Sequence, residues 1–169
     1  VEHYFRPQLI NRVDALVVFH KLHHQDMLHI VDLEAGKVSA TLDLRPGKLD
    51  PAQAGVPGGE VPLWVTIKGN STAYVSSVRD REIVVLDVSG APRVVKRIPV
   101  GGNPNKMLLD REQGRLFVAV DNTDTVAVIS TATNEVVKAI ATTGPRDRVN
   151  GPVPPGSSPH GLALSPAEK

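Results

Sequence analysis

Short apolar runs of strand length recur along the chain, and clusters of polar turn residues separate them. In the segment 103–142 the runs are KMLL, LFVAV, VAVI and VVKAI, and the intervening turns are DREQG, DNTD and STATN. Runs rich in Val, Ile and Leu that are bounded by Gly, Asn and Asp are typical of antiparallel strands joined by tight turns. The spacing of a helix is absent, and no apolar run has the length of one. The pattern therefore predicts an almost entirely β protein without helices.

The pattern is also an internal repeat of about 42 residues. Pro62, Pro104 and Pro159 align with one another, and Val75 aligns with Val118. Four antiparallel strands in every ~40–45 residues form one blade of a β-propeller. We therefore expect an all-β fold, a β-propeller of four-stranded antiparallel blades, present as an incomplete set of about three blades. The blade-like repeats span about 13–44, 61–100 and 103–142, and another starts at 158–169.

Residues 1–169 are accordingly expected to form a single partial propeller domain. The strands are predicted near Ala15–His20, Leu28–Leu33, Lys37–Leu44, Leu63–Lys68, Ala73–Val78, Ile83–Val88, Arg93–Val100, Lys106–Leu109, Leu116–Val120, Val126–Ile129 and Glu135–Ile140.

Two stretches carry a family resemblance. LFVAVDNTDTVAVISTATNEVVKAI and GSSPHGLALSP resemble the YVTN-type β-propeller repeat of bacterial and archaeal surface and periplasmic proteins. Ser130 stands where that family usually has Asp, whereas Asp32 and Asp87 keep the Asp in other copies. The first copy departs most, with a His-rich stretch in place of a short turn. The resemblance implies the propeller fold and a periplasmic, extracellular or cell-surface location, while the family is a scaffold with many uses.

The repeats leave the propeller open at both ends, because propellers typically close at four to eight blades. An open stack of blades exposes apolar faces at each end. We expect the remaining blades to lie beyond this chain, in a longer polypeptide. The alternative is a half-propeller that associates with itself.

All the long loops are expected at one end of the blades. In an antiparallel meander the turn between the second and third strands and the crossover to the next blade lie at the same end. The long segments Lys21–Met27, Arg45–Glu60 and Thr143–Ser157 fall only in these two classes. Long loops on a rigid scaffold often carry binding or catalysis. The Pro- and Gly-rich crossovers are alternatively stiff, solvated connectors.

The first strand of each repeat begins at that same end, so its polar positions should ring the mouth of the central channel. An aromatic ring, an amide, a cation and an imidazole there are predicted to bind a small ligand or an anion. The alternative is that the Trp packs against the next blade and the His is a solvated strand end. The candidate residues are Trp64, Asn105, Lys106 and His160.

A cluster of histidines, HKLHHQDMLH, is a candidate metal site. Neutral imidazole is the commonest metal ligand, so His20, His23 and His24 could hold a divalent metal such as Zn²⁺ or Cu²⁺. Asp26 could add an oxygen ligand. The spacing matches no HExxH motif and the chain has no Cys. The alternative is a solvated polar loop. Beyond such a metal, the sequence leaves the cofactor unidentified.

Composition excludes several classes of function. The net charge is +1, which gives no field directed at nucleic acid. Apolar runs fall far short of the ~20 residues of a membrane span. No GxSxG motif marks a nucleophilic serine. Carboxylates such as Asp80, Glu82 and Asp110 are placed in turns, where Asp is a turn former first.

These observations favour a non-catalytic propeller scaffold that binds a protein or small-molecule partner on its long-loop face. The alternative is the propeller part of a larger enzyme, because similar propellers occur with alkaline-phosphatase-like phosphoesterase domains or carry metal or haem redox chemistry. A third possibility is a purely structural repeat of a cell-surface layer.

Overall fold

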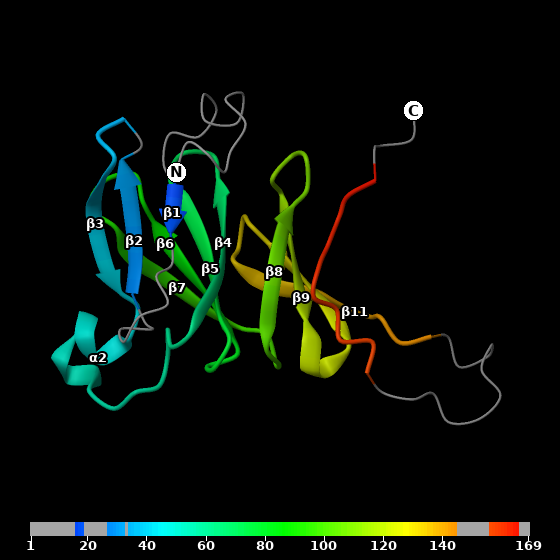
Figure 1. Cartoon of the computed structure of the whole chain (residues 1–169). Coiled ribbons are helices and arrows are strands. Elements are labelled where there is room, and N and C mark those ends of the chain that lie inside the picture. The colour runs from blue at the N-terminus through cyan, green and yellow to red at the C-terminus, as the bar shows by residue number, and fades with distance from the viewer. Residues whose placement is uncertain (1–15, 19–26, 33, 145–155, 166–169) are drawn as a thin grey trace.

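The computed structural model describes residues 16–18, 27–32, 34–144 and 156–165, and its described strands form three antiparallel sheets (Figure 1). The first sheet has three strands, and the second and third have four each. The strands begin and end within two residues of their predicted positions. They are β1 (Leu16–Val18), β2 (Met27–Asp32), β3 (Lys37–Asp43), β4 (Pro62–Lys68), β5 (Thr72–Ser77), β6 (Glu82–Asp87), β7 (Arg93–Pro99), β8 (Pro104–Leu109), β9 (Arg115–Val120), β10 (Thr125–Ser130) and β11 (Glu135–Ala141).

Each four-stranded sheet is a meander in chain order, β4-β5-β6-β7 and β8-β9-β10-β11. The registers of the two sheets correspond. Val75 pairs with Val84 on the following strand, and Val118 pairs with Ala127 in the same way. Val75 and Val118 are therefore equivalent residues of successive blades, which is the alignment that the sequence predicts. The all-β propeller-type fold is confirmed, with blades built from consecutive antiparallel strands.

A bulge at the same place in the outermost strand of every sheet marks the repeat most clearly. In each case the pairing register shifts opposite two equivalent residues of the neighbouring strand, so one residue of the outermost strand has no pairing partner. The extra residues are Ser39 on β3, Val95 on β7 and Val137 on β11. A bulge interrupts the row of backbone groups on an edge strand and so discourages pairing with another chain.

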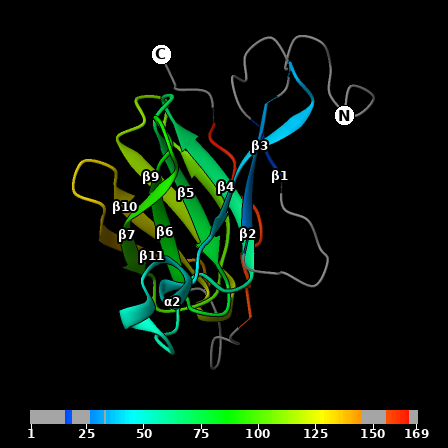
Figure 2. The same ribbon diagram turned by 90° about the vertical axis from the view of Figure 1, so that its left-hand side faces the viewer.

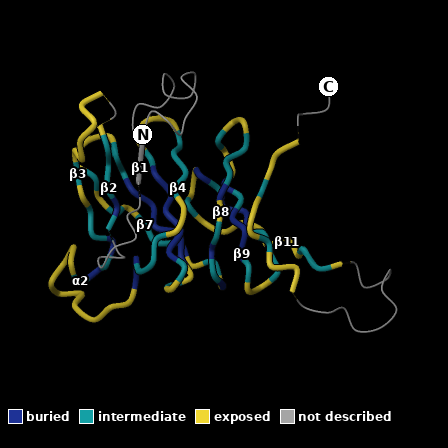
Figure 3. The backbone as a smooth tube through the Cα atoms, viewed as in Figure 1, coloured by how far each residue is buried: buried dark blue, intermediate teal, exposed yellow. Residues whose placement is uncertain are grey.

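The second sheet is the best buried part of the protein, because it is packed on both faces (Figure 3). One face joins the first sheet through an apolar cluster that includes Leu28, Val75 and Leu86. The other face joins the third sheet through a cluster that includes Tyr74 and Val118. Alternate residues of β5 and β6 therefore serve two interfaces, which is why the central residues of these strands, 73–75 and 83–86, are all apolar rather than alternating.

Within the described ranges, three short helical turns lie outside the sheets, where the sequence predicts none. They are α2 (Pro46–Leu49), η1 (Pro51–Gln53) and η2 (Asp121–Thr123). Pro46 and Pro51 each occupy the start of a turn, where a fixed φ favours helix and no backbone N–H is needed. Asp50 caps η1 by accepting a hydrogen bond from the backbone N–H of Ala52 at 3.0 Å. Turns of three or four residues escape a search for helical periodicity.

The described loops lie at the end of the blades where they were expected. The segment with α2 and η1 lies at the same end as the β5–β6 turn (Figures 1 and 2), and Gly59 donates its N–H to Glu82, the first residue of β6. Gly156 likewise donates to Asp124, which follows η2 in the β9–β10 turn. Most of Lys21–Met27 and of Thr143–Ser157 lies outside the described residues.

Candidate ligand-binding site on the inner strands

Three equivalent segments start at the loop-bearing end of the protein. They are β4, β8 and residues 156–165, and each carries a Pro at the same position of the repeat. β4 contacts β8. Figure 1 shows residues 156–165 as a red extended segment that runs in the same direction as β8, on the side away from β4. The innermost positions of three successive repeats are thereby brought side by side.

Trp64 on β4 and Lys106 on β8 contact each other across this boundary. The Lys106 Nζ lies 5.3 Å from the centre of the Trp64 ring, which is a cation–π contact. The backbone of Trp64 is fixed because its N–H donates to the Oγ of the fully buried Ser76 at 2.9 Å. Trp64 as a whole residue nonetheless keeps 38% of its surface exposed. Trp64 is therefore not fully enclosed between the blades.

Asn105 and His160 form the second contact, between β8 and residues 156–165. The Asn105 Nδ2 and His160 Nδ1 are 2.8 Å apart. An amide nitrogen only donates, so the imidazole Nδ1 accepts and the proton of the neutral ring lies on Nε2. Both Lys106 and His160 are exposed.

The four predicted residues therefore form a row of two pairs rather than one enclosed pocket. Consecutive residues of a strand point to opposite sides, so Asn105 and Lys106 direct their side chains to different neighbours. Lys106 turns toward Trp64, and Asn105 turns toward His160. The row Trp64–Lys106–Asn105–His160 presents an aromatic ring, an ammonium, an amide and an imidazole along the inner edge of three repeats.

Asp124, which sequence reasoning missed, anchors residues 156–158 next to this row. Its carboxylate accepts the N–H groups of Gly156 and Ser158, both at 2.8 Å, and the Ser157 hydroxyl at 3.2 Å. The backbone N–H of Gly156, followed by that of Ser158, lowers the pKa of Asp124 below its usual value. The equivalent position in the second repeat is Arg81, so the repeat pattern gave no sign of this role.

Glu82 anchors the other long loop. This side chain, placed in a turn by sequence reasoning, is buried at the start of β6. Its Oε1 accepts hydrogen bonds from the Gly59 N–H at 2.8 Å and from Arg97 Nη1 at 2.6 Å. Arg97 also donates through Nη2 to the carbonyl of Leu44. The two ends of the long loop, Leu44 and Gly59, are therefore held by one ion pair.

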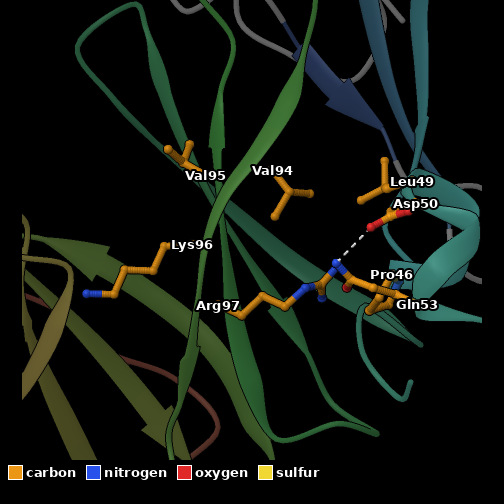
Figure 4. Close-up of a pocket in the computed structure, with 8 residues that line it drawn as sticks. All are labelled: Pro46, Leu49, Asp50, Gln53, Val94, Val95, Lys96 and Arg97. Carbon is orange, nitrogen blue, oxygen red and sulfur yellow. Dashed lines mark hydrogen bonds between the residues drawn. The ribbon is translucent and has the colours of Figure 1, made fainter. Parts of the chain in front are cut away.

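A groove of about 360 Å³ lies on the outer rim, between this loop and β7 (Figure 4). Its lining combines apolar and charged side chains, and the Gln53 amide donates to Asp50 within it at 3.3 Å. None of the sequence-predicted site residues lines this groove. Its lining includes Leu49, Asp50, Gln53, Val94, Val95 and Arg97.

The predicted histidine cluster is not described by the structure, because His20, His23 and His24 lie outside the described residues. His29 on β2 contacts the Thr41 hydroxyl through Nδ1 at 3.1 Å. Among the described residues, no three His, Cys, Asp or Glu side chains are arranged to hold a metal ion. No helix within the described ranges is long and apolar enough to cross a membrane.

Comparison with known proteins gives the fold class. No family model matches the chain. The chain superposes on hydrazine synthase from Kuenenia stuttgartiensis with a TM-score of 0.61 at 19% identity, over 76% of this chain and 33% of that one. It superposes on the periplasmic gluconolactonase of Pseudomonas aeruginosa with a TM-score of 0.56 at 19% identity, over 75% and 40%. Both are propeller-type proteins, and at this identity the likeness concerns the fold alone.

A short sequence match was also found to the chaperone protein ClpB of Rhodopseudomonas palustris. It is 34% identical over 74 residues, which is 44% of this chain and 8% of ClpB. The chain thus spans a small part of that relative and between a third and two fifths of the solved structures. The solved propeller proteins are therefore long enough to contain further blades beyond the region that this chain matches.

Proposed function

We propose that this chain is a non-catalytic binding module of a propeller, which holds a small organic anion at the row Trp64–Lys106–Asn105–His160. One observation carries the proposal: the inner segments of three successive repeats present an exposed ring, an ammonium, an amide and an imidazole in two contacting pairs. Trp64, Asn105 and Lys106 are placed by the paired strands β4 and β8, and Asp124 anchors the segment that carries His160.

The charge of Lys106 defines the chemical class of the ligand. Within the described ranges Lys106 makes no ion pair with a carboxylate, and its ammonium rests against the Trp64 ring. A carboxylate would supply the missing charge partner. The Nε2–H of His160 and the Asn105 amide would add donors, and the Trp64 ring would cover an apolar part of the same molecule. The ligand is accordingly a small carboxylate with a short carbon skeleton.

Trp64 is the single Trp of the chain, so its fluorescence reports on the proposed site directly. Titration with succinate should change the emission in a saturable way, whereas the neutral analogue succinamide should not. Lys106→Ala should weaken succinate binding about tenfold or more, since a hydrogen bond to a charged group contributes about 1.5–3 kcal/mol. Lys138→Ala, which removes an exposed lysine of β11, is the matched control and should leave binding unchanged. Equal affinities for Lys106→Ala and the unaltered chain would exclude the site.

The second candidate function is the propeller part of a larger enzyme. Its support is that two solved neighbours are named as enzymes and are each more than twice as long as the matched region. In that case the same row would bind a substrate or dock a catalytic part. The two functions are separated by the fate of the ligand: a binding module returns bound succinate unchanged, whereas an enzyme assembled on this chain converts its anionic ligand.

A periplasmic or cell-surface location is part of the same proposal. It rests on the resemblance to YVTN-type repeats, and the periplasmic gluconolactonase is compatible with it. Secretion of a tagged full-length protein into the periplasmic fraction would support this location, and recovery in the cytoplasm alone would contradict it.

The divalent-metal site at His20, His23 and His24 also remains a proposal. Titration of Zn²⁺ or Cu²⁺ into the unaltered chain and into a His23→Ala/His24→Ala variant tests it. Binding that is lost in the variant supports the site, whereas equally weak binding by both excludes it.

A further inference from the structure

The innermost strand of the second blade carries a β-bulge at the point where it enters the proposed site. On β4, Pro62 pairs with Ser77 on one side of the bulge. Trp64 pairs with Ser76 on the other side, which leaves Leu63 as the extra residue. Bulges are frequent next to functional sites, because they re-aim a side chain within a sheet. The bulge therefore contributes to how the Trp64 ring is presented.

The innermost strand of the third blade has a bulge at the equivalent place. Two residues of β8, Asn105 and Lys106, stand opposite Ala119, and neither of them pairs with it. The pairs that flank this bulge are Pro104–Val120 and Met107–Val118. Ala119 is the residue of the third repeat that corresponds to Ser76. Trp64 is thus paired across its bulge, whereas its equivalent Lys106 is not.

The hydroxyl of Ser76 accounts for this difference between the two bulges. Its Oγ accepts a hydrogen bond from the Trp64 N–H at 2.9 Å, and it donates to the Trp64 carbonyl oxygen at 3.5 Å. One side chain therefore holds both polar backbone groups of Trp64. Ser76 is fully buried, so bulk water does not compete for these bonds. Ala119 is equally buried, but its methyl group can form neither bond.

The two members of the cation–π pair are consequently held in different ways. The backbone of Trp64 is tied to β5 through both of its polar groups, whereas Lys106 lies in a stretch of β8 that does not pair with β9. The Lys106 ammonium rests 5.3 Å from the centre of the Trp64 ring. The ring is therefore the fixed member of the pair, and its position determines where the ammonium meets a ligand.

We propose that Ser76 is the positioning residue of this site. Its hydroxyl sets the place of the Trp64 ring against Lys106, and through the ring it sets the affinity for the ligand. The first part concerns the free protein, whereas the second part rests on the proposed function. Because Ser76 is fully buried, it acts through Trp64 and does not contact the ligand itself.

Ser77, the next residue of β5, provides a matched control. It is also fully buried, and its hydroxyl contacts the Glu60 carbonyl oxygen at 2.7 Å and the Asp80 Oδ2 at 3.2 Å. These bonds hold the end of the long loop and involve no atom of Trp64. Ser76→Ala and Ser77→Ala each remove one buried hydroxyl, so a general loss of stability should shift the urea midpoint of both variants similarly.

The first test observes the cation–π pair without a ligand. Protons above an aromatic ring are shifted upfield in NMR spectra, so the Lys106 side-chain signals should lie upfield in the unaltered chain. Ser76→Ala should remove most of this shift and accelerate hydrogen exchange of the Trp64 amide, whereas Ser77→Ala should change neither. Ser76→Thr keeps the hydroxyl and should retain both signatures. Unchanged Lys106 and Trp64 signals in Ser76→Ala, or equal changes in Ser77→Ala, would overturn the proposal.

The second test adds succinate. Ser76→Ala should bind it about two- to tenfold more weakly than Ser77→Ala, which corresponds to the net contribution of one hydrogen bond. Equal affinities of the two variants would contradict the control of affinity by Ser76 and leave the proposed function intact. If the unaltered chain bound no succinate, the proposed function would fall. The Lys106 and Trp64 signals of the first test would then still decide whether Ser76 positions the ring.

Discussion

Tyr74 on β5 donates a hydrogen bond from its hydroxyl to the Asn134 Oδ1 at 2.9 Å, and so ties the second blade to the β10–β11 turn of the third. Asn134 has a φ of 54°, a left-handed conformation that Asn tolerates better than most residues. Burial raises the pKa of Tyr74, so the hydroxyl remains a donor at neutral pH.

Removing this hydroxyl should loosen the junction between the two blades. Tyr74→Phe is expected to lower the free energy of unfolding by about 1 kcal/mol, the usual net contribution of one hydrogen bond. Asn134→Gly keeps the left-handed backbone accessible while it removes the acceptor. In a double-mutant cycle followed by urea unfolding, the two changes should be coupled by a similar amount. Strictly additive losses would show that the contact does not stabilise the fold.

Breaking the ion pair between Glu82 and Arg97 should lower the free energy of unfolding more than breaking the exposed ion pair of the same loop. Glu82→Gln leaves Arg97, which is mostly buried, without its charge partner and weakens the hold on Gly59. We expect a loss of about 1–3 kcal/mol in unfolding free energy. Arg79→Gln breaks the exposed pair with Glu60 and should cost about 0–1 kcal/mol. Equal losses in the two variants would contradict the anchoring role of Glu82.

Acidification should release residues 156–158 from the third blade. The pKa of Asp124 is lowered in the folded protein, so the stabilisation by its carboxylate is complete above the ordinary Asp pKa. It is lost as the pH falls through the lowered folded value. NMR signals of the Gly156 and Ser158 amides should shift together over that acidic range. In Asp124→Asn this transition should disappear, and its persistence would assign the release to another group.

The strands were predictable because each carries its own apolar run and turn residues, and because the repeat cross-checks the register. Val95 and Val137 illustrate this, because they lie 42 residues apart in the sequence and each is the extra residue of the equivalent bulge. The register of one repeat therefore supports the register of the other. The short helix α2 was missed because its formation depends on Pro46 at one turn rather than on any periodic pattern.

The candidate site was partly predictable for the same reason. Alignment of the repeats identified Trp64, Asn105, Lys106 and His160 as innermost positions, and the structure brings them together in two pairs. The anchors Glu82 and Asp124 were not predictable. Each accepts a hydrogen bond from a backbone N–H that is distant in sequence, Glu82 from Gly59 and Asp124 from Gly156. Every residue except proline has a backbone N–H, so the sequence does not indicate which one will bind a given carboxylate.

Chemical-shift mapping during a succinate titration tests the proposed binding site most directly. Signals of the Trp64 indole N–H, the Asn105 side-chain amide and the His160 ring should move together with one saturation curve. The groove between α2 and β7 offers Gln53, whose side-chain amide is an internal control and should not move. Shifts confined to the Gln53 amide, or no saturable shift at Trp64, Asn105 and His160, would contradict a ligand site on the inner strands.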